Sequence, residues 1–432
     1  MKYALVNATV LDGTADMQPL HNAVVLVNGD RIEQVVGEHT KLPDLQDYEF
    51  VDIDGGYVLP GLINLHAHLA PSGKPPKPRK KPVDYTKMYA LMTGNRAIRA
   101  LAKSMVARFA QIELYSGVTT LRTAGGVLDF DAQIRDEIYA GKRKGPRILP
   151  ANTAISVPGG HFAGSIATIA HDEDEARSQV RALADSGAQW VKLMVTGGVM
   201  DADKEGEPGV LRMPEEIVQA ACDEAHRLGL KVEAHAESAA GVRVALEHGV
   251  DTVEHGAELD DELVSLFKST GAAYINTISP SLPYALFDIE ESHALPEAKV
   301  NGNIVMQGMI DCAKRCLEEG IPVGLGNDVG CPFVAHYDYW RELCYFHKFV
   351  GASTVQTLHT ATLGNARIVG IDEYTGSIEA GKFADMIVVD SNPLEDLSVL
   401  RNVRMVFMQG RMVDRPRIKR YAATDALLDR YL

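Results

Sequence analysis

The chain has 432 residues, of which 46% are hydrophobic and 23% are charged, so it is long enough to bury a large core. Its formal charge of −15 argues against a nucleic-acid partner, because such binding relies on Lys and Arg to neutralise phosphates. No export signal is recognisable, and no apolar run approaches the roughly 20 residues that cross a bilayer. The five cysteines, sparse and odd in number, favour reduced thiols. We therefore expect a cytoplasmic protein without nucleic-acid or membrane partners.

Both ends of the chain are rich in short β-type segments. Near the amino terminus, strands are expected over 3–6, 23–27 and 31–36, with Asn28-Gly29-Asp30 as a hairpin turn. Towards the carboxyl terminus, strands are expected over 384–389, 403–408 and 411–413. We predict that residues 1–57 and 365–432 together form a small β-sandwich domain.

Between these ends, over residues 58–364, apolar β-type runs alternate with segments of helical periodicity. The eight runs cover 57–65, 119–121, 147–149, 190–195, 232–234, 252–253, 273–275 and 323–325, and helices are expected over 217–228 and 304–317. This alternation predicts an α/β fold of the (β/α)8 TIM-barrel type. The catalytic groups of such barrels lie at the carboxyl ends of the strands.

The first barrel strand ends in His66-Ala67-His68. Alternate residues of a strand face the same side, so both imidazoles can bind one cation. Two structural histidines on an ordinary strand would give the same sequence pattern. The motif therefore indicates a metal site only in combination with the residues described next.

Lys192 interrupts the otherwise apolar strand of residues 190–195. Burying a free ammonium is costly, and a lysine that is salt-bridged or extends its amino group to water would explain it simply. A lysine desolvated among metal ions can instead lose its proton and react with CO2. The resulting carbamate is an anion that can bridge two metals.

Three further residues follow strands. His235 and His255 each end a predicted strand, and Asp328 comes just past the eighth. The tripeptide Glu-His-Gly occurs twice, but His248 ends a helical pattern before Gly249, so we interpret His248 as structural and His255 as a ligand. Asp328 could also be a simple turn or N-cap residue.

Together these features resemble the amidohydrolase superfamily, in its two-metal branch with a carbamylated lysine on the fourth strand. The resemblance includes residues 58–63 before the paired histidines and residues 376–385 before the last β segments. It implies one metal held by His66, His68, Lys192 and Asp328, and a second held by Lys192, His235 and His255. Lys192 would be carbamylated by CO2 and bridge the two divalent ions. Four histidines favour zinc as the metal, and we also expect a homo-oligomer.

Within the superfamily, residues 191–194, 196–199 and 158–161 look like those of Xaa-Pro dipeptidase, aryl-amide-hydrolase and imidazolonepropionase-like relatives. The chain departs from many of these relatives at two places. Glu237 stands where they have Tyr, and Arg122-Thr123 stands where they have an Arg-Asp pair.

Two metals that share an anionic bridge can lower the pKa of a bridging water and polarise a carbonyl, which suits amide hydrolysis by metal-activated hydroxide. Asp328 would orient the hydroxide, accept its proton and pass that proton to the leaving nitrogen. His161 would stabilise the oxyanion or anchor the substrate, unless it is a structural histidine after a glycine turn. We predict a small amide substrate such as an Xaa-Pro dipeptide or an N-acyl amino acid.

Three alternatives are weighed against this function. Opening of a cyclic amide, such as an imidazolone or hydantoin ring, needs the same metal chemistry and stays open. Deaminases of the superfamily usually bind one metal, lack the strand-four lysine and carry an acid three residues after the strand-five histidine. Here Lys192 is present and Glu237 is two residues after His235. The complete ligand set argues against a barrel that has lost catalysis.

Residues 71–82 contain five prolines and five Lys or Arg residues, and begin just after His68. We expect a loop over the barrel mouth, either a solvated spacer or a functional element. Its positive field would favour a carboxylate-bearing substrate on a protein of net negative charge.

Overall fold

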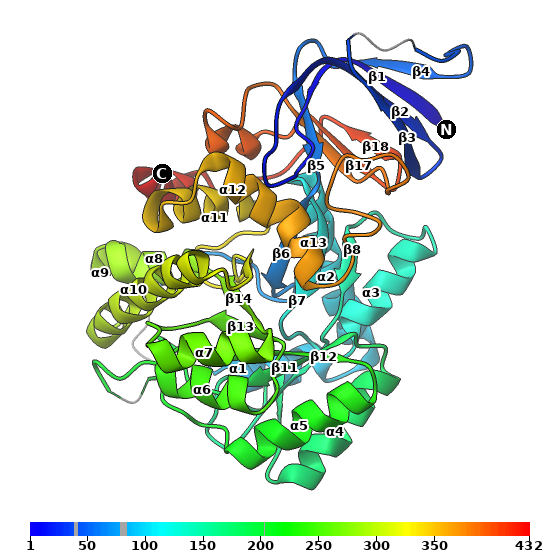
Figure 1. Cartoon of the computed structure of the whole chain (residues 1–432). Coiled ribbons are helices and arrows are strands. Elements are labelled where there is room, and N and C mark those ends of the chain that lie inside the picture. Colours follow the sequence, from blue (N-terminus) through cyan, green and yellow to red (C-terminus); the bar gives the residue numbers. More distant parts are fainter. Residues whose placement is uncertain (39–41, 78–83, 203) are drawn as a thin grey trace.

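The computed structural model describes residues 1–38, 42–77, 84–202 and 204–432, and has a β-rich part above an α/β part in Figure 1. The β-rich part contains β1 (Lys2–Val10), β2 (Leu20–Asn28), β3 (Arg31–Val36), β4 (Glu49–Asp52), β5 (Tyr57–Pro60), β16 (Met386–Val389), β17 (Met405–Met408) and β18 (Arg411–Asp414). These strands form one sheet of order β18-β17-β16-β5-β1-β2-β3, with β4 beside β1. The two chain ends therefore meet in one sheet, while its division into sandwich layers and the domain boundaries at 57 and 365 stay predictions.

The register of this sheet follows from its turns and its apolar pattern. Gly29 adopts a φ of 65° in the turn between the paired residues Asn28 and Arg31, as expected of a tight hairpin. Tyr3 and Leu5, alternate residues of β1, are buried in one apolar cluster. The alternation thus decides which face of the sheet is covered.

The expected strand over 57–65 is wrong in one respect, because the run is divided between two sheets. Its first part, β5, pairs antiparallel with β16 in the small sheet, and its second part, β6 (Leu62–Ala67), belongs to the barrel. The division falls at Gly61, where an added Cβ would lie 2.1 Å from the Thr119 hydroxyl oxygen. Only glycine permits this close approach, and a uniformly apolar run gives no sign of the change of sheet.

All eight predicted barrel runs contain a strand in the structure. Besides β6, these are β7 (Val118–Thr123), β8 (Arg147–Leu149), β11 (Trp190–Met194), β12 (Lys231–Ala236), β13 (Thr252–His255), β14 (Ala273–Asn276) and β15 (Val323–Leu325). Two short strands that the sequence did not predict, β9 (Ala154–Ser156) and β10 (Ala167–Ile169), precede β11.

The barrel strands are parallel and form the series β6-β7-β8 and β10-β9-β11-β12-β13-β14-β15. A parallel bridge between Ala67 and Val329 connects the end of β6 to the segment after β15. At the other junction, the backbone N–H of Gln189 donates to the Pro150 carbonyl oxygen at 2.7 Å, which links the segments flanking β8 and β11. The strands thus build a barrel of the TIM type.

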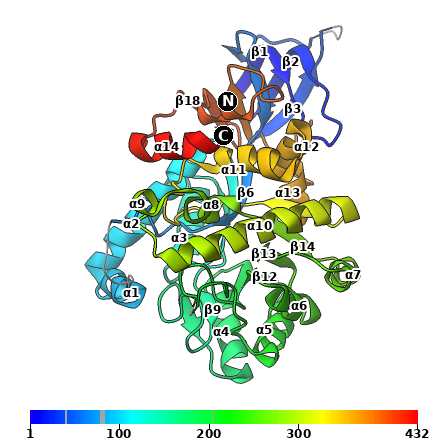
Figure 2. The same ribbon diagram turned by 90° about the vertical axis from the view of Figure 1, so that its left-hand side faces the viewer.

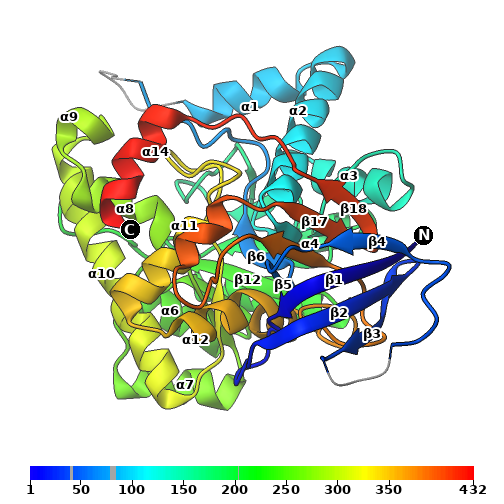
Figure 3. The same cartoon turned by 90° about the horizontal axis from the view of Figure 1, so that it is seen from above.

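Helices surround the barrel strands (Figure 2). They are α1 (Tyr85–Thr93), α2 (Arg96–Tyr115), α3 (Phe130–Tyr139), α4 (Glu173–Asp185), α5 (Glu215–Arg227), α6 (Ala239–Glu247), α7 (Asp261–Thr270), α8 (Ile278–Leu286), α9 (Ile289–Ser292), α10 (Pro296–Glu319), α11 (Tyr339–Tyr345), α12 (Thr354–His359), α13 (Asn365–Ile368) and α14 (Ala422–Leu428). Further short helical segments are η1 (Phe346–Val350), η2 (Thr360–Gly364), η3 (Leu397–Arg401) and η4 (Asp429–Tyr431). Seen from above, α14 lies beside α11, where Arg341 pairs with Asp425 at 3.1 Å (Figure 3). Within the described ranges, no helix is both long and apolar enough to cross a membrane.

Helix α4 illustrates why these segments form and where they pack. The Asp172 side chain accepts a hydrogen bond from the Glu175 backbone N–H at 2.8 Å, which satisfies a donor at the start of the helix. Ala176, Val180 and Leu183 recur at helical spacing and are buried. Burying a Val or Leu side chain contributes about 1.5–3 kcal/mol, so this face fixes the helix against the barrel.

Candidate metal centre

The paired histidines of β6 face one point, as their spacing predicts. The Nε2 atoms of His66 and His68 lie 3.6 and 3.1 Å from the same Oδ1 atom of Asp328. Two donors that each bind one ion at about 2.1 Å can be at most about 4.2 Å apart. Each of the two imidazoles is therefore close enough to Asp328 to share a cation with its carboxylate.

Lys192 lies in the middle of β11 and is 1% exposed. Its Nζ atom has no hydrogen-bond partner among the described residues. Burial lowers the pKa of Lys192, although the nearby carboxylates of Glu233, Glu254 and Asp328 oppose this effect. A buried, partnerless amine of lowered pKa is the chemical state that carbamylation by CO2 requires.

His235 and His255 complete the predicted group from β12 and β13. Their ring centroids are 4.5 Å apart, and the ring of His255 is 4.9 Å from that of His66. Burial lowers the pKa of both His235 and His255, which keeps neutral imidazoles available as ligands. His255 has a φ of 70°, and its Nδ1 atom is 2.7 Å from the Thr277 hydroxyl oxygen. A left-handed backbone is costly for a residue with a side chain, so neighbouring contacts hold this ring in place.

Asp328, three residues past the end of β15, also has a left-handed backbone, with a φ of 52°. Its backbone N–H donates to the His66 carbonyl oxygen at 2.9 Å, which fixes the turn beside β6. Burial alone would raise the pKa of Asp328, but the adjacent His66 and His68 lower it below its usual range. The geometry excludes a simple helix cap, because Asp328 precedes no helix and directs its carboxyl group at the two imidazoles.

The donor atoms form two overlapping groups. In one, the donors of His66, His255 and Asp328 lie within 4.8 Å of one another, and in the other so do those of His235, Glu237 and His255. Histidine nitrogens and carboxylate oxygens around a buried lysine are a chemically suitable set for two divalent ions. Glu237 was not predicted as a donor, although the alternation His235-Ala236-Glu237 places both side chains on the same side of the chain.

A buried ionic network supports the candidate ligands and was not predicted from the sequence. The Nδ1 atom of His66 is 2.7 Å from Glu254 Oε2, while Glu254 Oε1 accepts a hydrogen bond from Arg122 at 2.8 Å. The Arg122 side chain also pairs with Glu233 at 2.9 Å and donates to the Thr252 hydroxyl oxygen at 2.9 Å. A carboxylate on the far nitrogen of a ligating histidine fixes its tautomer and orientation.

Replacing Glu254 by glutamine should weaken metal binding about 10- to 100-fold, because an amide supports the His66 imidazole less well than a carboxylate does. Metal affinity measured by chelator competition is the readout. The repeated tripeptide offers a matched control, since Glu247 of Glu247-His248-Gly249 ends α6 and contacts only Arg243, at 3.9 Å, among its described ion-pair partners. Equal affinities in Glu254→Gln and Glu247→Gln would contradict the positioning role.

His161 lies beside the centre, after β9. Its ring stacks on that of His235 with centroids 4.4 Å apart and an interplanar angle of 13°. Its Nδ1 atom is 2.7 Å from Asp201 Oδ2, and Asp201 also accepts the Gly198 backbone N–H at 2.6 Å. This position is compatible with the predicted contact to substrate, and Asp201, which the sequence did not single out, orients the ring.

Histidines that were assigned no role lie in other surroundings. His248 ends α6 before Gly249, whose φ is 92°. His226 pairs with Asp251 at 2.9 Å, and the His347 Nδ1 atom is 2.6 Å from the Ala352 carbonyl oxygen. For His248, this placement is compatible with the interpretation of that side chain as structural.

The basic proline-rich loop is described only up to Lys77, so Pro78, Arg79, Lys80, Lys81 and Pro82 lie outside the described residues. Gly73 packs closely on the Val334 carbonyl group, and the His336 Nε2 atom is 2.9 Å from the Pro71 carbonyl oxygen. The start of the loop is therefore fixed against the segment that follows β15. Its proposed interaction with a carboxylate stays a hypothesis.

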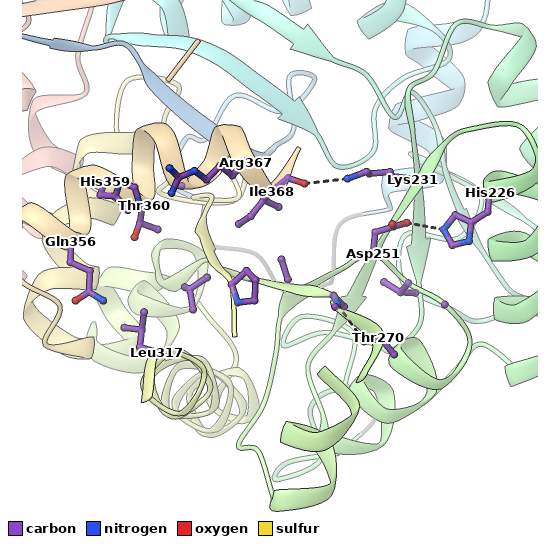
Figure 4. A pocket seen from close by; sticks show the side chains of 18 residues that line it. His226, Lys231, Asp251, Thr270, Leu317, Gln356, His359, Thr360, Arg367 and Ile368 are labelled. Atoms are coloured by element: carbon purple, nitrogen blue, oxygen red, sulfur yellow. Dashed lines mark hydrogen bonds and ion pairs between the residues drawn. The ribbon is translucent and has the colours of Figure 1, made fainter. Parts of the chain in front are cut away.

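A cavity of about 840 Å³ lies away from the candidate centre (Figure 4). Its lining includes Lys231, Asp251, Ala273 and Val323, which stand at or just before the amino ends of β12 to β15. Apart from Lys192 in the middle of β11, the candidate ligands stand at or near the carboxyl ends instead. Because TIM-barrel enzymes catalyse at the carboxyl ends, this cavity is not the candidate active site.

Comparison with known proteins agrees with this arrangement. The sequence pattern of the Amidohydrolase family matches residues 57–413. The chain belongs to the amidohydrolase family. The match thus extends from β5 to β18. Members of this family hydrolyse C–N bonds, and this amidohydrolase is accordingly a hydrolase of that class.

Individual relatives of this amidohydrolase cover nearly the whole chain. A solved structure from Bifidobacterium longum, provisionally named a prolidase, is 37% identical with a TM-score of 0.86, and the match covers 99% of this chain and 98% of that one. Ochratoxinase from Aspergillus niger is 26% identical, with 90% of this chain and 82% of that protein covered. Imidazolonepropionase from Treponema denticola is 24% identical, with 90% and 91% covered. The predicted resemblance to prolidase-like and imidazolonepropionase-like amidohydrolases is confirmed.

Proposed function

We propose that this amidohydrolase cleaves the amide bond of a small substrate such as an Xaa-Pro dipeptide or an N-acyl amino acid, with two zinc ions and a carbamate on Lys192. The observation that carries the proposal is the convergence of His66, His68 and Asp328 near the partnerless Lys192 amine. Similarity to the provisionally named prolidase supports the substrate class.

When bound, the two ions would polarise the scissile carbonyl and lower the pKa of a water molecule between them. The chain supplies the proton transfers. The Asp328 carboxylate faces the two imidazoles of β6, with Oδ1 3.1 Å from His68 Nε2, and would accept a proton from the attacking water. Asp328 would then pass that proton to the leaving nitrogen and complete the cleavage, because a neutral amine is a better leaving group than its deprotonated anion.

His161 would contact the substrate from its position stacked on the His235 ring. With Nδ1 facing Asp201, a doubly protonated His161 ring would donate from its other nitrogen to the substrate carbonyl oxygen or carboxylate. Positive charge on the loop of residues 71–82 would add long-range attraction for a carboxylate. Formation of a homo-oligomer stays a prediction.

A substrate panel tests this function. The metal-loaded protein should hydrolyse acyclic Xaa-Pro dipeptides or N-acyl amino acids faster than hydantoin or imidazolone rings. Removing the metals should leave about 1% of this activity or less, and zinc should restore it, because the ions carry most of the carbonyl polarisation. Faster ring opening would favour the cyclic-amide alternative, and release of ammonia from an amino-substituted ring would indicate a deaminase.

A further inference from the structure

Glu237 is a buried carboxylate at the mouth of the barrel that the predicted ligand set does not use. It follows β12 directly, and its side chain is 8% exposed. Its backbone N–H donates to the Thr196 hydroxyl oxygen at 3.1 Å, which fixes the position of the residue. Among the described residues, its Oε2 atom has no hydrogen-bond partner. Burying a carboxylate in this way is costly unless a cation compensates it.

The distances identify a place for that cation. Glu237 Oε1 is 3.9 Å from His235 Nε2, within the limit of about 4.2 Å for two donors of one ion. The donors of His235, Glu237 and His255 all lie within 4.8 Å of one another.

The neighbouring carboxylate does not share this situation. Asp201 is 39% exposed in its side chain and already accepts hydrogen bonds from the Gly198 backbone N–H and the His161 ring. The partner of Glu237 in the described salt bridges is His235, at 3.9 Å. Glu237 accepts a hydrogen bond from the Val199 backbone N–H, but in the described salt bridges no cationic group lies closer to it than His235, so its negative charge is less compensated than that of Asp201.

We propose that Glu237 is a ligand of the metal ion held by His235 and His255. This inference rests on the proposed two-metal centre, and it gives the second ion a carboxylate oxygen in addition to two imidazoles and the bridging Lys192. The extra anionic ligand strengthens binding of the second ion. It also explains why a carboxylate can be buried at position 237, where the resemblance to the superfamily implies that many relatives have a tyrosine.

The test is metal binding in Glu237→Gln, an almost isosteric change, with Asp201→Asn as the matched control that removes another carboxylate charge from the same mouth. The folded fraction of each variant is first confirmed by circular dichroism. Chelator competition and elemental analysis then follow the two ions, and Co²⁺ substitution reports their coordination by absorption. Glu237→Gln should bind the second ion about 10- to 100-fold more weakly, and its Co²⁺ absorption spectrum should differ from that of the unaltered protein. Asp201→Asn should still bind two ions.

Unchanged metal affinity and an unchanged Co²⁺ spectrum in Glu237→Gln would overturn the assignment. A raised KM with both metals retained would likewise overturn it, since Glu237 would then contact the substrate. The binding measurement needs no substrate, so it decides the ligand role of Glu237 even if the substrate panel refutes amide hydrolysis. Binding of only one ion by the unaltered protein would refute the two-metal centre itself.

Discussion

Replacing Lys192 by methionine should abolish the binding of one or both metal ions and lower kcat/KM at least about 1,000-fold, equivalent to about 4 kcal/mol of transition-state stabilisation. Methionine fills a similar apolar volume in β11, but it cannot react with CO2 to form a bridging anion. Because Lys192 is 1% exposed and its amine has no hydrogen-bond partner among the described residues, the substitution breaks no direct hydrogen bond. If the variant loses activity but remains as stable as the unaltered protein, the loss is therefore due to the missing carbamate bridge.

Lys231 provides the control for this substitution. It is the first residue of β12, at the opposite end of the barrel, and its Nζ atom donates to the Ile368 carbonyl oxygen at 3.4 Å. Lys231→Met should leave metal content and turnover nearly unchanged. Intact-mass measurement on the unaltered protein should show a CO2 adduct that is lost in acid. A Lys192→Met variant that retains two ions and its activity would contradict the carbamate assignment.

Much of the fold was predictable because the barrel strands are short, apolar and separated by helical periodicity. The division of the run of residues 57–65 between two sheets was not predictable in this way, since β5 and the first part of β6 have the same apolar texture. Gly61 marks the change, but its role depends on Thr119, a residue brought close only by the closed barrel. Such steric contacts depend on tertiary structure.

The candidate ligands were predictable for a different reason. His66 and His68 follow the two-residue period of a strand, and Lys192 is conspicuous in an apolar segment. The supporting network was not predicted, because Arg122 and Glu254 lie on β7 and β13 and meet only once the barrel has closed. Charged residues within apolar strands were the available signal. Their partners depend on strand order, which spacing along the chain does not give.

Asp328→Asn should separate proton transfer from metal binding, with turnover falling about 100- to 10,000-fold while much of the metal remains. An amide oxygen can still approach an ion held by His66 and His68, but it cannot accept and return a proton at neutral pH. The backbone should tolerate the change, because asparagine readily adopts the left-handed conformation that Asp328 has at a φ of 52°. Measured together, metal content and kcat distinguish the two roles. If metal and activity fall in parallel, Asp328 serves only as a ligand and another group transfers the proton.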